Sequence, residues 1–184
     1  MQTKAIILRK QVTREYDQHI ICYTQEVGKL TAVAKSSLKG TSTQGRHLDV
    51  LNLVSFDVIN GRSVPIITGA QNEDTFPHVR SSLPHLAVAY FFLEVIDRIA
   101  YEHQKDDRLW NFLSSTLREL DWVDRPMLME FFREKQTDFL HTLGYALEKP
   151  VVAVANDELL NLDSTFEYTF NTHFHSLELL YQVT

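Results

Sequence analysis

The sequence has too few cysteines for a disulfide bond or for a cysteine-based metal-binding motif. Cys22 is the one cysteine among 184 residues, which excludes an internal disulfide and a zinc site built from several cysteines. No run approaches the ~20 apolar residues that a membrane-spanning helix needs, and there are no repeats or low-complexity segments. The opening segment, MQTKAIILRKQ, has no small-residue cleavage site, so we expect a strand there and not a signal peptide. These absences favour a cytoplasmic globular protein with no membrane partner.

Recognisable catalytic and nucleotide-binding motifs are also missing. Residues 35–46, KSSLKGTSTQGR, place Gly40 and Gly45 at a spacing that imitates a phosphate-binding loop. Such a loop ends in Gly-Lys-Ser/Thr, whereas Gly45 is followed by Arg46 and His47, so the magnesium-binding hydroxyl is absent. There is no Gly-x-Ser-x-Gly elbow or other active-site motif. We therefore expect a protein that is not an enzyme and that uses no cofactor.

Two pairs of possible metal ligands stand close together in the sequence. His19 and Cys22 are three residues apart on a predicted strand, where such positions point to opposite faces. His173 and His175 share a face only if the backbone is extended, and no third ligand is evident beside them. We predict no metal site, and we expect Cys22 to be a small core residue.

The net charge of −6 conceals two unlike halves of the chain. Residues 1–80 contain ten Lys and Arg against seven Asp and Glu, whereas residues 81–184 contain eight against seventeen. A modest positive excess in an otherwise acidic protein indicates different roles for the two halves.

The first part of the chain predicts five short strands joined mostly by tight turns. In LTAVAK, the period of two places Leu30, Ala32 and Ala34 on one face. Asn60-Gly61 predicts a type I′ hairpin turn, and Pro65 places the returning strand at an edge or beside a bulge. Five strands with one long polar loop favour an oligonucleotide-binding (OB) barrel, while an SH3-like barrel or an open meander fits less well. The predicted strands cover residues 4–10, 17–24, 30–35, 50–59 and 62–68.

From Ser81 to His103 the apolar pattern is helical, and residues 86–96 within it are apolar nearly all round, which predicts a buried helix. Further helices are expected after caps at Asp107, at Asp124 with Pro126, and at Asn171 or Thr172, with Gly144 ending the second of them. A short strand is expected at 151–155. The predicted fold class is α+β, with a five-stranded OB-fold β-barrel domain at 1–78 and a C-terminal α-helical domain at 79–184.

The cations of the first half suit a polyanionic partner. Lys and Arg neutralise phosphates, the amides of a Ser/Gly-rich loop add donors, and aromatic rings stack on unpaired bases. Tyr16, Tyr23 and Phe56 are candidate rings; Phe56 is expected in the core, and Tyr16 suits either role. The predicted DNA-binding residues are Lys35, Lys39 and Arg46, with Arg9, Lys10, Arg14, Lys29 and Arg62 as secondary phosphate contacts, and Tyr16.

Residues 5–71 carry an ordered series of short motifs. They are an acidic Asp17 in the first turn, Thr24-x-Glu26-x-Gly28-Lys29, Ala34-Lys35, the basic loop from Lys39 to Arg46, and Gly61-Arg62. In order and spacing this region resembles the N-terminal part of the RecO family of recombination mediators. FLHTLGYALE (139–148) and HFHSLELLYQV (173–183) resemble the family's Leu-Gly-Tyr segment and closing helix.

The resemblance implies a non-enzymatic protein of recombinational DNA repair with an OB-fold domain. Members bind single- and double-stranded DNA, anneal complementary strands, and act with RecR and the single-stranded-DNA-binding protein to load the recombinase. Many members also carry a four-cysteine zinc module after the Leu-Gly-Tyr segment, and the cysteine-free residues 148–172 do not provide it. The alternative is a protein-interaction adaptor of the repair machinery with weak or no DNA binding.

Overall fold

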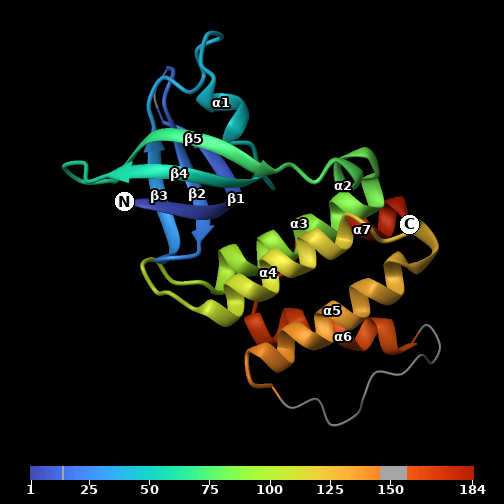
Figure 1. Ribbon diagram of the computed structural model, residues 1–184. Helices are drawn as coiled ribbons and strands as arrows, with labels where there is room; N and C mark the ends of the chain where they lie inside the picture. The colour runs from blue at the N-terminus through green and yellow to red at the C-terminus, as the bar shows by residue number, and fades with distance from the viewer. Residues whose placement is uncertain (14, 146–156) are drawn as a thin grey trace. The chain divides into compact units, whose positions relative to one another are not determined.

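The protein, represented by a computed structural model, is described for residues 1–13, 15–145 and 157–184 (Figure 1). Apart from one four-residue helix between the third and fourth strands, strands come first and helices follow, which confirms the predicted α+β class. Within the described ranges, no helix combines the length and apolar character that crossing a membrane requires. The elements are β1 (Gln2–Val12), β2 (Gln18–Thr24), β3 (Gly28–Ala34), α1 (Gln44–His47), β4 (Leu53–Ile59), β5 (Ile66–Asp74), α2 (Pro77–Ser81), α3 (Leu83–Ile99), α4 (Asp107–Leu120), the 3-10 helix η1 (Arg125–Met127), α5 (Leu128–Thr142), α6 (Asp157–Phe170) and α7 (His175–Val183).

The five strands close into a barrel in the order β1-β2-β3-β5-β4, with β1 pairing β4. Neighbouring strands are antiparallel except for β3 and β5, which run parallel. This confirms the predicted OB-type barrel. Because the barrel is closed, the edge strand expected beside Pro65 is wrong. Pro65 precedes β5 and accepts a hydrogen bond from the Val33 N–H at 2.8 Å, while the alternative of a bulge agrees with the β4–β5 register shift between Asp57 and Val58.

The barrel core follows from the alternation of side chains along the strands. Leu30, Ala32 and Ala34 are all buried on one face of β3, as the period of two predicts. Cys22 and Phe56 belong to the same core, so both were interpreted correctly from the sequence. Each large apolar side chain buried there stabilises the fold by about 1.5–3 kcal/mol.

The β4–β5 connection differs from the predicted two-residue turn. Ile59 pairs with Ile66, so the loop contains residues 60–65. Neither Asn60 nor Gly61 has the positive φ that a type I′ turn requires. Glycine is needed at position 61 for space, because a Cβ atom there would lie 2.0 Å from the Val64 carbonyl oxygen. The loop is longer because Pro65 cannot donate to the β ladder and the strand begins after it.

By their contacts, the residues divide into two compact units. The first is Met1–Phe76 together with Ile99–Trp110, and the second is Pro77–Arg98 together with Asn111–Thr184. The segment Ile99–Trp110, called the strap below, was not anticipated as part of the barrel unit. Its His103 N–H donates to the Lys29 carbonyl at 2.9 Å, and its Glu102 carboxylate accepts a hydrogen bond from the Thr31 hydroxyl.

The second unit has a core of phenylalanine rings. The centroid of Phe91 on α3 lies 5.0–5.5 Å from those of Phe92, Phe132, Phe166 and Phe174. Buried side chains extend along most of α3, as its almost wholly apolar sequence predicts. The pairs with Phe92, Phe132 and Phe166 are edge-to-face, a geometry that stabilises a core beyond its buried area.

The ends of the helices correct several expected caps. Asp106, and not Asp107, caps α4, since its Oδ1 accepts hydrogen bonds from the N–H groups of Arg108 and Leu109. Gly144 ends α5 with φ +88°, as predicted. Helix α6 was not predicted. Asn171 and Thr172 follow α6 and do not cap α7, whose N-cap is the extended Phe174. The strand expected at 151–155 lies outside the described residues.

Candidate nucleic-acid interface

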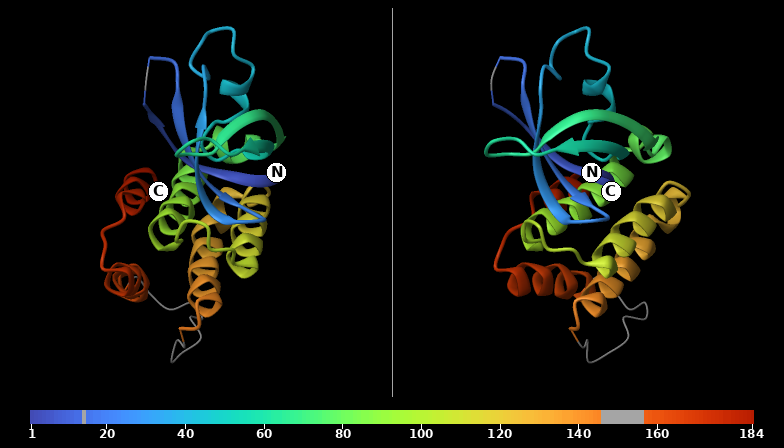
Figure 2. Two further views of the ribbon diagram at one scale, coloured as in Figure 1. Left: turned by 90° about the vertical axis from the view of Figure 1, so that its left-hand side faces the viewer. Right: turned by 60° about the vertical axis from the view of Figure 1, so that its left-hand side comes forward.

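One end of the barrel carries the β1–β2 turn and the long β3–β4 connection, which lie side by side in the different views (Figures 1 and 2). The Leu38 N–H donates to the Tyr16 carbonyl at 3.1 Å. The Ser36 N–H donates to Asp17 Oδ1 at 2.7 Å, and Ser36 itself has a positive φ of 54°. The connection is therefore tied to the turn at defined points, and its first part has a fixed conformation.

Four predicted residues share this end of the barrel. Lys39 Nζ lies 5.5 Å from the centroid of the Tyr16 ring, a cation–π distance, and Tyr16 remains 43% exposed. Lys35 directly follows β3 and is exposed. Arg46 is exposed on the short helix α1 and does not close an irregular loop as expected. Tyr16, Lys35, Lys39 and Arg46 are called the loop cluster below.

The position of α1 is fixed by close packing against the start of the connection. A Cβ atom at Gly45 would lie 2.3 Å from the Ser37 carbonyl oxygen, so only glycine allows this approach. Asn52 holds the other end of the helix, because its side-chain amide donates to the His47 carbonyl at 3.0 Å. Arg46 is thereby presented from an anchored element.

The other predicted contacts in this region are on β1. Arg9 is exposed and pairs with Ile21 in the β1–β2 register. Lys10 forms a salt bridge with Asp49, so part of its charge is already neutralised within the protein. Arg14 lies outside the described residues.

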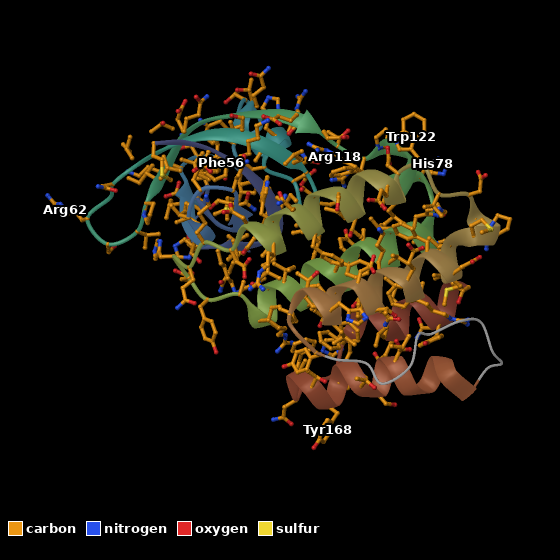
Figure 3. The ribbon with its side chains drawn as sticks, turned by 60° about the horizontal axis from the view of Figure 1, so that its bottom comes forward. Phe56, Arg62, His78, Arg118, Trp122 and Tyr168 are labelled. Carbon is orange, nitrogen blue, oxygen red and sulfur yellow. The ribbon has the colours of Figure 1, made fainter. Side chains whose placement is uncertain are left out.

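Lys29 and Arg62 are not brought to the loop cluster. Lys29 lies near the start of β3, beside the strap, whereas Lys35 follows the end of the same strand. Arg62 is exposed on the β4–β5 loop, and Figure 3 shows it at the tip of that loop. Of the nine residues that the sequence groups together, the eight that the structure describes lie in at least three places.

Two of the three candidate rings are not available to bases. Phe56 is 1% exposed. Tyr23 is also buried, and its hydroxyl donates to the Asp106 carbonyl at 3.3 Å. Burial, followed by the negative charge of Asp106, raises the pKa of Tyr23 to about 12. The suggestion that Tyr23 stacks on bases is therefore wrong, and Tyr16 is the exposed ring of the three.

The C-terminal unit brings together a set of metal-ligating groups that the sequence analysis did not recognise. Ligand atoms of His173, His175 and Glu178 all lie within 4.8 Å of one another. Hydrogen bonds that His173 donates to the carboxylates of Glu178 and then Glu167 raise the pKa of His173. The missing third ligand is Glu178, and its spacing of three from His175 would have indicated it if the start of α7 had been placed correctly.

Comparison with known proteins agrees with the barrel. Residues 1–76 match the family model described as "Recombination protein O N terminal". The chain is 32% identical to the "DNA repair protein RecO" of Dehalococcoides mccartyi over 148 residues, 80% of this chain and 57% of that protein. It is 27% identical to the protein of the same name from Geobacter metallireducens over 159 residues, 86% of this chain and 64% of that protein.

A third relative is the "DNA repair protein RecO" of Alkaliphilus metalliredigens, 26% identical over 117 residues, 64% of this chain and 48% of that protein. The chain thus spans between 48% and 64% of the length of these three relatives. The similarity to the two longer matches extends over most of the chain, including residues beyond the barrel.

Proposed function

Because the chain belongs to the RecO family, we propose that it is a DNA-binding mediator of recombinational repair that holds strands against the loop cluster. The proposed role is to bind and anneal strands without catalysis. Its proposed partners are single- and double-stranded DNA, a RecR-like protein and the single-stranded-DNA-binding protein.

The observation that carries the proposal is the pairing of Tyr16 with Lys39. The backbone of Tyr16 is anchored by the hydrogen bond that its carbonyl accepts from the Leu38 N–H, yet 43% of the residue remains exposed. A base that stacks on such a ring gains about 1–3 kcal/mol. Lys39 is exposed beside the ring, so a phosphate next to the stacked base would meet a cation.

Lys35 and Arg46 extend this contact along a phosphate backbone. Both are exposed, and each is attached to an anchored part of the connection. Because these cations meet phosphates and not base edges, the proposed binding is independent of sequence. Arg9 is a further contact in the proposal, whereas Lys10 contributes less because Asp49 already neutralises it. Lys29 and Arg62 are proposed only for duplexes or longer strands.

The decisive experiment is a salt titration of single-stranded DNA binding. Each phosphate contact contributes about 0.7 to the slope of log affinity against log salt. Replacing Lys35, Lys39 and Arg46 with Ala should therefore flatten the slope by about 2, measured by fluorescence anisotropy. Tyr16→Ala should weaken binding without changing the slope, because the ring carries no charge.

The matched control replaces Lys4, Lys105 and Arg125, which are exposed and belong to other elements. It removes the same net charge and should leave the slope unchanged. Equal slopes for the two triple variants would contradict the proposed site. If the unmodified protein ignores DNA at low salt and instead captures a repair protein in a pull-down, the adaptor function replaces the one proposed.

A further inference from the structure

A short extended segment joins α6 to α7 and presents two histidines on one side. Phe174 has φ −103° and ψ 109° and is completely buried. Successive side chains of an extended chain point to opposite faces, so His173 and His175 both point away from the core, and both are exposed. The buried Phe174 ring thus fixes the direction of its two neighbours.

The start of α7 is fixed as well. Glu94 on α3 accepts hydrogen bonds from the Ser176 N–H at 3.1 Å and from the Ser176 hydroxyl at 2.7 Å. His175 is the first residue of α7, and Glu178 lies one turn further on the same face. Glu178 Oε2 is 3.9 Å from His175 Nδ1, and Glu178 Oε1 is 3.0 Å from His173 Nε2.

His173 is oriented by a second carboxylate. Its Nδ1 lies 2.6 Å from Oε1 of Glu167 on α6, so each ring nitrogen faces a carboxylate oxygen. A neutral imidazole has one N–H, and when Glu167 accepts it, Nε2 holds a lone pair directed at Glu178. As an imidazolium His173 donates to both carboxylates, and a metal ion bound at Nε2 would take the place of the proton that faces Glu178. A carboxylate that fixes the tautomer of a ligating histidine is a usual partner in protein metal sites.

We propose that His173 Nε2, His175 Nδ1 and the Glu178 carboxylate bind one divalent metal ion of the Zn²⁺ class, with Glu167 orienting His173. Two imidazoles and a carboxylate suit Zn²⁺ and related ions, and water completes a tetrahedron. Zinc bonds of about 2.0–2.1 Å place neighbouring ligand atoms about 3.3 Å apart. The separations of 3.0 and 3.9 Å, one to each oxygen of Glu178, lie on either side of that value, and the three ligand atoms lie within 4.8 Å of one another.

The role of this ion is structural. Its three ligands come from residues 173–178, so the ion would fasten the α6–α7 connection to the first turn of α7, and Glu167 of α6 would act on it through His173. The site uses no cysteine and lies on exposed side chains, so metal can enter and leave without unfolding of the chain.

The test is isothermal titration calorimetry of the full chain with ZnCl₂ in a buffer free of chelators. One ion per chain should bind. His173→Ala, His175→Ala and Glu178→Gln should each weaken binding at least ten-fold, and all three residues are exposed, so the fold should survive. Glu167→Gln should weaken binding by about 10–100-fold, the usual effect of losing a partner that orients a ligand.

His141→Ala is the matched control, since His141 is an exposed histidine on α5 outside the group. It should bind Zn²⁺ as the unmodified chain does. Co²⁺ bound in place of Zn²⁺ should give the visible absorption of a tetrahedral nitrogen and oxygen site. The proposal is overturned if no Zn²⁺ binds, or if a His173→Ala/His175→Ala double variant still binds one ion with unchanged affinity.

Discussion

At the scale of single residues, burial determines which groups are chemically reactive. Cys22 is completely buried, and its thiol donates to the Leu30 carbonyl at 3.4 Å. Burial, and then the negative charge of Glu102, raise the pKa of the Cys22 thiol far above its ordinary range. Because the thiolate is the nucleophile, this cysteine is inert in the folded protein.

We expect a thiol reagent such as Ellman's reagent to leave the native chain unmodified at pH 8. In guanidinium chloride the same reagent should modify one thiol per chain, because the unfolded thiol recovers its ordinary pKa and is accessible. The measurement is absorbance against time in the two conditions. Rapid reaction of the native chain would mean that the barrel opens readily around Cys22.

Gly28 is a second position where one residue decides a contact. It has φ +74°, and a Cβ atom there would lie 1.9 Å from the Gln104 carbonyl oxygen of the strap. Gly28→Ala should lower the free energy of unfolding by at least about 2 kcal/mol, through strain at positive φ and the displaced strap. Gly40→Ala is the control, since nothing lies within 4 Å of its Cβ position and its φ is not positive. Similar urea midpoints for both variants would contradict this account.

At the scale of elements, the start of α4 depends on the Asp106 cap. Burial acts to raise the pKa of Asp106, but hydrogen bonds from Arg108 and from the Leu109 N–H outweigh it, and the pKa is lowered. A lowered pKa means that the folded state favours the carboxylate. The cap therefore stabilises the fold fully above about pH 4, the ordinary pKa of aspartate, and this contribution is lost as the pH falls through the lowered value.

Asp106→Ala should cost about 1 kcal/mol of stability at pH 7, the usual effect of removing an N-cap. The difference from the unmodified chain should shrink as the pH falls below 4. Urea unfolding followed by circular dichroism at pH 7 and pH 3 measures both quantities. Asp107→Ala should have a smaller effect at pH 7, because Asp107 pairs with Lys105 at the exposed surface. A larger loss of stability for Asp107→Ala than for Asp106→Ala would contradict the assignment of the cap to Asp106.

The elements also show how far the sequence predicts this fold. The alternation of apolar residues in the strands and the apolar sequence of α3 predicted the barrel and the helical core correctly, because both patterns reflect burial directly. The turn at Asn60-Gly61 was wrong because Pro65 delays the returning strand. The predicted start of α7 was too early because Asn171 and Thr172 are good capping residues. The actual N-cap is Phe174, which is held by packing in the core.

The sequence predicted the candidate site from residue types alone, and the fold determines which of those residues lie close together and are exposed. Tyr16 and Lys39 were expected and are adjacent. Lys10 is engaged by Asp49, a partner thirty-nine residues away that no local pattern connects to it. Tyr23 and the exposed Tyr16 were indistinguishable by composition, because only the barrel closure decides which ring is inside.

At the scale of the whole molecule, the chain crosses between the two units three times, after Phe76, Arg98 and Trp110. The barrel unit is therefore not a continuous segment. The strap completes it through two hydrogen bonds. The Glu102 carboxylate accepts one from the Thr31 hydroxyl, and the Asp106 carbonyl accepts the other from the Tyr23 hydroxyl.

A fragment of residues 1–78 should consequently be less stable than the barrel in the full chain. Without the strap, the buried Tyr23 hydroxyl loses its partner, and the packing of the β2–β3 turn is exposed. Amide hydrogen exchange should show lower protection for β2 and β3 in the fragment than in the full chain. Equal protection in both would show that the strap contributes nothing to the barrel.

The strap also limits how this protein can be rearranged by recombination between genes. A foreign barrel joined ahead of α2 would need a glycine at the position of Gly28, because a side chain there would collide with the Gln104 carbonyl oxygen of the strap. Barrel and strap are thus expected to be inherited together, although more than twenty residues of helix separate them in the chain.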